Sequence, residues 1–267
     1  MNAFREPSFA WEPLTPRGVA AFARASFERL FIVQSVFALL ATAAVVWCLS
    51  DGIYPVIDEA INQLPDAGSV HGGKLDWRDD SPLMLAEGRI LAISVDLQHT
   101  GALRSPADYQ IEFGRDDIRI YSIFGEGYLN YPGGYIIAAN REEARPAWGA
   151  WGPDMIGLAA IGAFLGLLFV WAILAAIYCL PVWLLCFFAN RDLNFPASWK
   201  LAGAALLPGS ALVSIGMVMY DLGGFDLVQL GFTFAMHLII GWIYLFVSPL
   251  FLNRVLPAEK KNPFGKK

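Results

Sequence analysis

Four long runs of apolar residues constrain this chain more than any other feature of its sequence. A helix needs about 20 consecutive apolar residues to cross the hydrocarbon core of a bilayer. Hydrophobic residues make up 56% of the chain, and charged residues make up only 16%, against about 25% in soluble domains. The sequence therefore predicts an α-helical integral membrane protein with four transmembrane helices. The four runs are residues 30–49, 155–188, 201–220 and 227–250.

The second run is longer than one crossing requires, because a helix rises by about 1.5 Å per residue and the bilayer core is about 30 Å thick. Proline lacks the amide hydrogen that continues a helix, so Pro181 predicts the end of this span. We expect the span at residues 155–180, with "PVWLLCFF" at the membrane interface. The first run predicts a retained anchor, since it exceeds a typical signal-peptide core and no A-x-A cleavage site follows it.

Basic residues indicate the orientation of these spans. They lie before the first run, between the second and third runs, and after the fourth run, whereas "DLGGFD" between the third and fourth runs has none. Because basic residues in short loops mark the cytoplasmic side, we expect both termini in the cytoplasm. The predicted domains are a cytoplasmic segment (1–29), a first transmembrane helix (30–50), an extracytoplasmic domain (51–153), transmembrane helices two to four (154–252) and a basic cytoplasmic tail (253–267).

The cytoplasmic segment before the first run contains a predicted entry helix. Thr15 is a typical N-cap residue, and Pro16 suits the first position of a helix. On a helical projection the charged residues share one face, and the apolar residues lie opposite. We therefore expect an amphipathic helix on the inner membrane surface that runs into the first span. Its apolar face consists of Val19, Phe22 and Leu30.

The extracytoplasmic segment, residues 51–153, is long enough for one small domain. "YPVIDEAINQLP" has apolar residues at helical spacing, whereas "ILAISVDLQ", "YQIEF", "IRIYSIF" and "YIIAA" predict strands separated by glycine-rich turns. We expect a small α+β domain with a mainly antiparallel sheet. Acidic residues outnumber basic residues in this segment, which argues against a nucleic-acid partner.

Acidic residues in the extracytoplasmic segment raise the question of a metal site. "DWRDDSP" contains Asp76, Asp79 and Asp80, and two histidines, His71 and His99, lie nearby in the sequence. The spacing matches neither an EF-hand nor a zinc motif. A solvated acidic turn is the favoured interpretation, so we predict no metal and no cofactor. No sequence motif for a nucleophile or a phosphate-binding loop predicts a catalytic residue.

Polar and small residues form a stripe on the fourth run, with His237 near its middle. The spacing i, i+4, i+8, i+11 and i+15 places these residues on one helical face. The third run carries a similar stripe that includes Ser210 and Ser214, and the second run contains the GxxxG pair Gly162 and Gly166. Since small residues let helices approach closely, we expect these stripes to pack together. The stripe on the fourth run consists of Thr233, His237, Gly241, Tyr244 and Ser248.

An ionisable residue inside a membrane span is a functional candidate by default. Histidine can stay neutral, however, and a proton relay needs several ionisable groups. The favoured interpretation of His237 is a hydrogen bond between helices. A role in proton or substrate transfer, and a metal role with Met217 or a cysteine, remain as alternatives.

Three short stretches resemble a family of uncharacterised bacterial polytopic membrane proteins, which includes a membrane protein of maltodextrin-utilisation operons. "LTPRGVAAFAR" is similar to that family's entry segment, with Thr15 in place of serine. "ISVDLQHTG" is similar to its strand that ends in an Asp and Thr-Gly turn, here Asp96, Thr100 and Gly101. "FPASWKLAGAALLPG" is similar to its return into the membrane, and more distantly to Yip-type proteins. The resemblance implies a non-enzymatic role at the bacterial cytoplasmic membrane and no catalytic residues.

Three functions are compatible with these features. The favoured one is an accessory, sensing or scaffolding protein that acts through its extracytoplasmic domain, with the lipid bilayer and a membrane-protein partner or a second copy of itself as partners. The alternatives are a subunit of a transporter or permease with His237 in its polar stripe, and an intramembrane enzyme.

Overall fold

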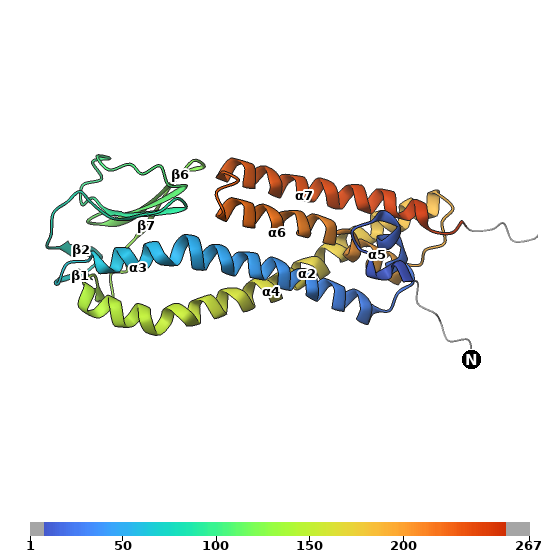
Figure 1. Cartoon of the computed structure of the whole chain (residues 1–267), viewed down its shortest axis with the longest axis horizontal. Helices are drawn as coiled ribbons and strands as arrows, with labels where there is room; N and C mark the ends of the chain where they lie inside the picture. Colours follow the sequence, from blue (N-terminus) through green and yellow to red (C-terminus); the bar gives the residue numbers. More distant parts are fainter. Residues whose placement is uncertain (1–7, 255–267) are drawn as a thin grey trace, which may run out of the picture. The chain divides into compact units, whose positions relative to one another are not determined.

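Residues 8–254 are described by the structure, a computed structural model (Figure 1). Its helices confirm the four apolar segments that are long enough to cross a membrane. A separate small, mainly antiparallel sheet domain is confirmed as well. Two units are defined by their internal contacts: a helical unit (the described residues up to Thr42, 163–216, and from Val228 on) and a sheet unit (43–162 and 217–227). The four long segments are Phe27–Asn62, Arg141–Phe188, Phe195–Asp221 and Leu227–Phe251.

Two of these segments differ from the sequence prediction in where their helices end. The first consists of α2 (Phe27–Cys48), a π-helical turn (Leu49–Ile53) and α3 (Tyr54–Asn62). The second is one helix, α4 (Arg141–Phe188), which continues through Pro181, where the sequence predicts the end of the span. A proline inside a helix removes one backbone hydrogen bond, and apolar membrane-type helices tolerate this loss when the flanking turns keep theirs.

The third segment is divided into α5 (Phe195–Ala205) and α6 (Leu207–Asp221), which meet at Leu206. Pro208 falls in the first turn of α6, where a helix leaves its amide positions unpaired, so proline costs little there. The fourth segment is α7 (Leu227–Val247), followed by a 3₁₀ turn at Ser248–Phe251.

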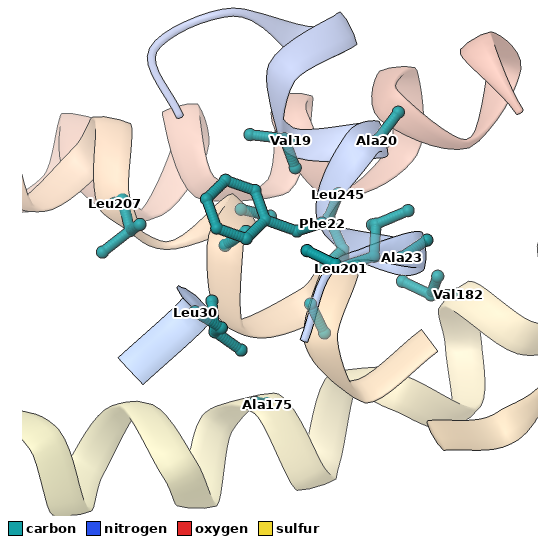
Figure 2. Packing of buried hydrophobic residues seen from close by; sticks show 14 of the residues in the cluster. Val19, Ala20, Phe22, Ala23, Leu30, Ala175, Val182, Leu201, Leu207 and Leu245 are labelled. Atoms are coloured by element: carbon teal, nitrogen blue, oxygen red, sulfur yellow. The ribbon is translucent and has the colours of Figure 1, made fainter. Parts of the chain in front are cut away.

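The core of the helical unit includes the predicted entry helix (Figure 2). After a 3₁₀ turn at Ser8–Trp11, α1 (Pro16–Ala21) begins where the sequence predicts, and the Thr15 side chain accepts a hydrogen bond from the Gly18 amide at 3.0 Å. The three residues of the predicted apolar face, Val19, Phe22 and Leu30, are buried against protein, so the prediction that this face lies on the membrane surface is wrong. The helix also does not run into the first span, because a 3₁₀ turn at Phe22–Arg24 and the extended residue Ala25 separate the two. The core includes Val19, Phe22, Leu30, Ala175, Leu201, Leu207 and Leu245.

The sheet unit contains two sheets. The five-stranded sheet has the order β3-β4-β5-β6-β7, and the three-stranded sheet has the order β2-β1-β8. All neighbouring strands are antiparallel except β4 and β5, which are parallel. The strands are β1 (Gly68–His71), β2 (Lys74–Trp77), β3 (Leu83–Glu87), β4 (Leu91–Val95), β5 (Tyr109–Phe113), β6 (Asp117–Ser122), β7 (Gly125–Asn130) and β8 (Ile137–Ala138).

Both faces of β4 and β5 are covered, and the two coverings differ in polarity. Helix α3 contributes Val56 and Ala60 to the core on the apolar face. The opposite face carries buried Gln110 and Glu112. Parallel neighbours need a crossover connection of about a dozen residues, usually a helix. Here the connection, residues 96–108, has no helix, and it folds over the polar face instead.

Candidate functional site

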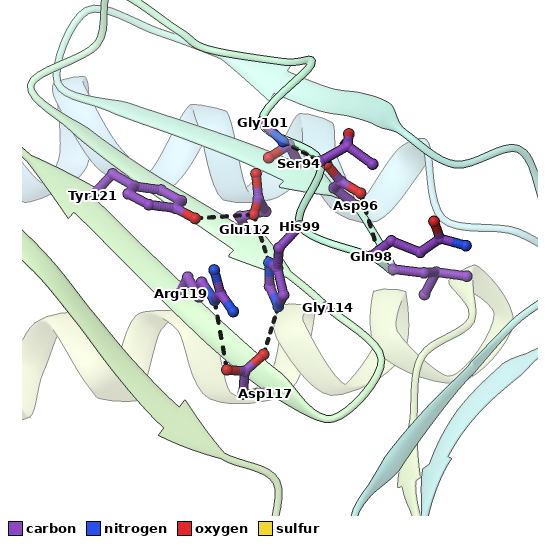
Figure 3. Close-up of polar contacts among 12 residues, drawn as sticks. Ser94, Asp96, Gln98, His99, Gly101, Glu112, Gly114, Asp117, Arg119 and Tyr121 are labelled. Atoms are coloured by element: carbon purple, nitrogen blue, oxygen red, sulfur yellow. Dashed lines mark hydrogen bonds and ion pairs between the residues drawn. The ribbon is translucent and has the colours of Figure 1, made fainter.

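The ring of His99 lies between two carboxylates at the start of the crossover loop (Figure 3). Its Nδ1 atom is 2.6 Å from a carboxylate oxygen of Glu112 on β5, and its Nε2 atom is 2.5 Å from a carboxylate oxygen of Asp117 on β6. A carboxylate oxygen only accepts hydrogen bonds, so the ring satisfies both contacts when both nitrogens carry a proton. In that form the ring is a cation between two anions.

The backbone around this ring has an unusual conformation. His99 has φ of +50°, in the left-handed region that few side-chain-bearing residues adopt. A Cβ atom on Gly114 would lie 2.0 Å from Nε2 of His99, so only glycine leaves room for the ring. Residues held in such conformations persist when the surrounding structure determines them, and they are concentrated at functional sites.

Glu112 is the buried member of this cluster, with an exposed fraction of 0%. Besides His99, its Oε1 atom accepts a hydrogen bond from the hydroxyl of Tyr121 at 3.2 Å. Its second oxygen is buried without a hydrogen-bond partner among the described residues. An ionised carboxylate in such a place depends on its remaining partners, because burying a charge is costly unless it is paired.

Asp117 and its neighbours connect the cluster to solvent. Asp117 forms a second ion pair with Arg119 at 3.6 Å, and Arg119 also reaches Glu126 on β7 at 3.6 Å. A cavity of about 360 Å³ opens beside His99. Its lining is mostly charged or polar, which suits a small polar solute or a charged side chain of a partner. The cavity is lined by Leu97, Gln98, His99, Arg115, Asp116, Asp117, Arg119 and Asn130.

Asp96 shapes the loop that carries His99. Its carboxylate is buried and accepts hydrogen bonds from the Thr100 hydroxyl at 2.7 Å and from the amides of Gln98 and Gly101, both at 3.2 Å. Burial raises the pKa of the Asp96 carboxyl, but these hydrogen bonds outweigh burial and hold the pKa below its ordinary value. The role of Asp96 is therefore to brace the turn.

Gln110 fixes the far end of the crossover loop. Its amide nitrogen donates to the Ser94 hydroxyl at 2.9 Å and to the Leu103 carbonyl at 3.0 Å, and its oxygen accepts from the Ser105 amide at 3.1 Å. The loop is thus held on the sheet by two buried polar side chains of β5, one at each end.

The acidic residues singled out in the sequence lie elsewhere in the sheet unit and face solvent. Asp76 is paired with Arg78 at 3.4 Å, and an oxygen of Asp79 accepts from the Asp80 amide at 2.9 Å. His71 is exposed on β1. Within residues 8–254, no group of three His, Cys, Asp or Glu side chains is arranged to hold a metal ion.

The polar stripe of the fourth run lies on the packed side of α7 and of the 3₁₀ turn after it: Thr233 and Ser248 are buried, and His237 and Tyr244 are half-buried. Its hydrogen bonds differ from the prediction. Nδ1 of His237 bonds the Phe234 carbonyl of its own helix, rather than a group on another helix. The hydroxyls of Thr233, Ser210 and Ser214 likewise bond carbonyls of their own helices. Tyr244 differs, since its hydroxyl reaches the Leu14 carbonyl at 2.5 Å.

The close helix contact also lies at different glycines. Gly162 and Gly166 are exposed, and a Cβ atom on either would meet no described atom within 4 Å. Within a single copy of the chain, the prediction that these two glycines pack against the other stripes is therefore wrong. Helices α6 and α7 approach at Gly209 instead, where a Cβ atom would lie 2.5 Å from the His237 carbonyl oxygen. The polar stripe of α7 lies on its packed side, but the sequence does not indicate which glycine forms the close contact.

Sequence reasoning missed the His99 cluster as a unit. Its signal was the alternation in "YQIEF", which places Gln110 and Glu112 on one face of a strand. Such a face is ordinarily the solvated one, and here it is covered by the loop that brings His99 to it.

No protein-family model, no curated protein and no solved structure matches the chain. The fold and the site define its class: a chain with four membrane-length apolar helices and a small sheet domain that carries a histidine–carboxylate cluster around the buried Glu112.

Proposed function

We propose that this chain is an integral protein of the bacterial cytoplasmic membrane, with both termini in the cytoplasm and residues 51–153 outside. In this proposal it is a non-enzymatic accessory or sensing component, and its sheet domain recognises a solute or a membrane-protein partner. The four membrane-length apolar helices and the placement of basic residues in the sequence support the membrane part.

The His99 arrangement carries the functional part of the proposal. A domain selected for stability alone gains little from a fully buried carboxylate, a histidine at positive φ and a glycine that accommodates its ring. Together these features hold the His99 ring and its two carboxylates at the wall of a polar cavity. A rigid charged group beside a cavity favours recognition of a charged or polar partner.

The membrane topology is tested by accessibility labelling of single cysteines in a chain without its own three cysteines. Tyr128→Cys in the exposed strand β7 should react with a membrane-impermeant maleimide in intact spheroplasts, and Lys266→Cys should react only after lysis. Reaction of both positions in the same compartment would contradict the topology.

The recognition role is tested by photo-crosslinking from Asn130, which lines the polar cavity, in cells that make the full chain. We expect an adduct of defined mass that disappears in His99→Gln and persists in His71→Gln, a matched change at an exposed histidine of the same domain. An adduct that is indifferent to His99, or no adduct, would contradict this role. Solute flux in proteoliposomes that is abolished by His237→Gln would favour the transporter alternative instead.

A further inference from the structure

The helical unit contains a cavity of about 160 Å³ beside His237. Helices α2, α4, α6 and α7 contribute its walls, which are apolar except for three side chains: Ser210, His237 and Tyr178. Four aromatic rings line it: Trp171, Tyr178, Phe234 and Trp242. Neither the polar stripe nor the sheet domain explains why an imidazole should face such a cavity.

The hydrogen bond of His237 determines which ring nitrogen is available to a ligand. The Phe234 carbonyl only accepts hydrogen bonds, so Nδ1 of His237 carries the proton of the neutral ring. Nε2 is then an acceptor, and none of the residues 8–254 is bonded to it. The Tyr178 hydroxyl accepts from Trp242 Nε1 at 3.2 Å, so its own proton can still be donated. The cavity thus offers one acceptor and one donor in apolar surroundings.

The size and walls of the cavity narrow the class of ligand. An apolar protein cavity of about 150 Å³ binds benzene, so about 160 Å³ accommodates one six-membered ring and excludes a whole lipid. Aromatic walls favour an aromatic ring through edge and stacking contacts. The unbonded Nε2 atom favours a ring with a hydroxyl donor, because burying the ligand then leaves no acceptor of the protein unpaired.

The route of entry follows from the residues at the cavity rim. Val170 and Leu238 are 48% and 46% exposed, and both are apolar. In a chain inserted as proposed above, such residues face lipid tails. A ligand with an apolar tail therefore reaches the cavity from the bilayer.

We infer that this cavity binds the hydroxylated ring of a lipid-soluble phenol or quinol, whose hydroxyl donates to Nε2 of His237. The lipid route rests on the proposed membrane insertion, whereas the contacts in the cavity do not. Ser210 does not complete this site, since its hydroxyl donates to the Leu207 carbonyl at 2.8 Å.

The test compares 4-hexylphenol with hexylbenzene, which differs by the hydroxyl, as ligands of the full chain purified in detergent. Dissociation constants come from the rise of the unfolding temperature with ligand concentration. We expect 4-hexylphenol to bind about two- to tenfold more tightly than hexylbenzene, which is the gain that one net hydrogen bond provides. A third ligand, 2-hexylhydroquinone, distinguishes a quinol from a simple phenol. Tighter binding than that of 4-hexylphenol indicates a quinol, and equal binding indicates a simple phenol.

Variants keep the assignment to His237 falsifiable. His237→Phe should abolish the preference for the phenol, and His237→Gln, which retains an acceptor, should keep part of it. The control is Ser214→Ala. The Ser214 hydroxyl bonds the Ser210 carbonyl at 2.9 Å and does not line the cavity, so this variant should keep the full preference for the phenol. Equal affinity for the two ligands, or an unchanged preference in a folded His237→Phe protein, would overturn the inference. Because binding is measured in detergent, this outcome is independent of the cysteine-labelling result.

Discussion

His99 and His237 occupy opposite kinds of surroundings, and the difference shows how each unit of this chain accommodates polar groups. In the sheet unit both ring nitrogens of His99, which lies in a loop, contact carboxylates on the strands β5 and β6. In the helical unit His237 bonds a carbonyl three residues earlier in its own helix. The first arrangement exists only in the folded domain, whereas the second can form as soon as α7 is helical.

This contrast extends to the neighbours of each histidine. Around His99, Gln110 holds the crossover loop on the sheet through hydrogen bonds to Ser94 and Leu103, and Asp96 braces the turn at the start of that loop. Around His237, the hydroxyls of Thr233 and Ser214 bond their own helices. Polar groups therefore contribute to tertiary stability in the sheet unit, and mainly to local structure in the helical unit. The following substitutions test this difference.

The largest effect is expected for Glu112→Ala. Removing the Glu112 carboxylate leaves Nδ1 of His99 and the Tyr121 hydroxyl without their buried acceptor, and each such loss costs about 1–3 kcal/mol. Hydrogen exchange of the β5 and β6 amides in the full chain should report this loss. The control is Glu126→Ala, because its side chain is 51% exposed and pairs with Arg119 at 3.6 Å; its effect should be at most about 1 kcal/mol. Equal exchange in the two variants would refute the structural importance of the buried pair.

Asp96→Asn is expected to lower the stability of the sheet unit by less than Glu112→Ala does. It removes the charge from a side chain that accepts three hydrogen bonds. Hydrogen bonds to charged groups contribute about 1.5–3 kcal/mol. The folded state holds the pKa of Asp96 below its ordinary value, so its stabilisation is present above that ordinary value and disappears as pH falls through the folded-state pKa. The difference in stability between wild type and Asp96→Asn, measured by hydrogen exchange of the loop amides, should disappear as the pH falls. A gap that is constant with pH would contradict this origin.

In the helical unit we expect Gly209→Ala to be destabilising by about 1–3 kcal/mol, because its Cβ atom would overlap the His237 carbonyl oxygen and push α6 from α7. Gly162→Ala is the matched control, since its Cβ atom meets open space and alanine favours a helix by up to about 1 kcal/mol. Unfolding temperatures in detergent check both. A destabilising Gly162→Ala accompanied by loss of an oligomer would instead identify a contact between copies of the chain.

The smallest effect on stability is expected for His237→Phe, at about 1 kcal/mol or less. The lost hydrogen bond lies within one helix, and a net hydrogen bond contributes about 0.5–1.5 kcal/mol. The unfolding temperature without ligand checks this value. A loss as large as that of Glu112→Ala would mean that His237 supports tertiary packing after all, and the contrast between the two histidines would fail.

Several elements were predictable because they depend on local patterns. The four apolar runs correspond to the four long helices, since a run of that length has few other ways to bury its side chains. Thr15 and Pro16 specify the start of α1 through capping chemistry. Alternation predicts β4, β5 and β6. The continuity of α4 through Pro181 was not predictable. Proline removes one backbone hydrogen bond, but the helical segments on both sides favour a continuous helix, and the local sequence does not show which effect is larger.

The membrane-length apolar helices, the cap of α1 and the alternating strands were determined by the sequence itself, because each depends on residues within a few turns of one another. The tertiary structure alone decided that the polar face of β5 is covered, that His99 lies between Glu112 and Asp117, and that Gly209 rather than Gly162 meets a neighbouring helix. These contacts join segments far apart in the chain, so they depend on which surfaces meet, and no local pattern of residues encodes that choice.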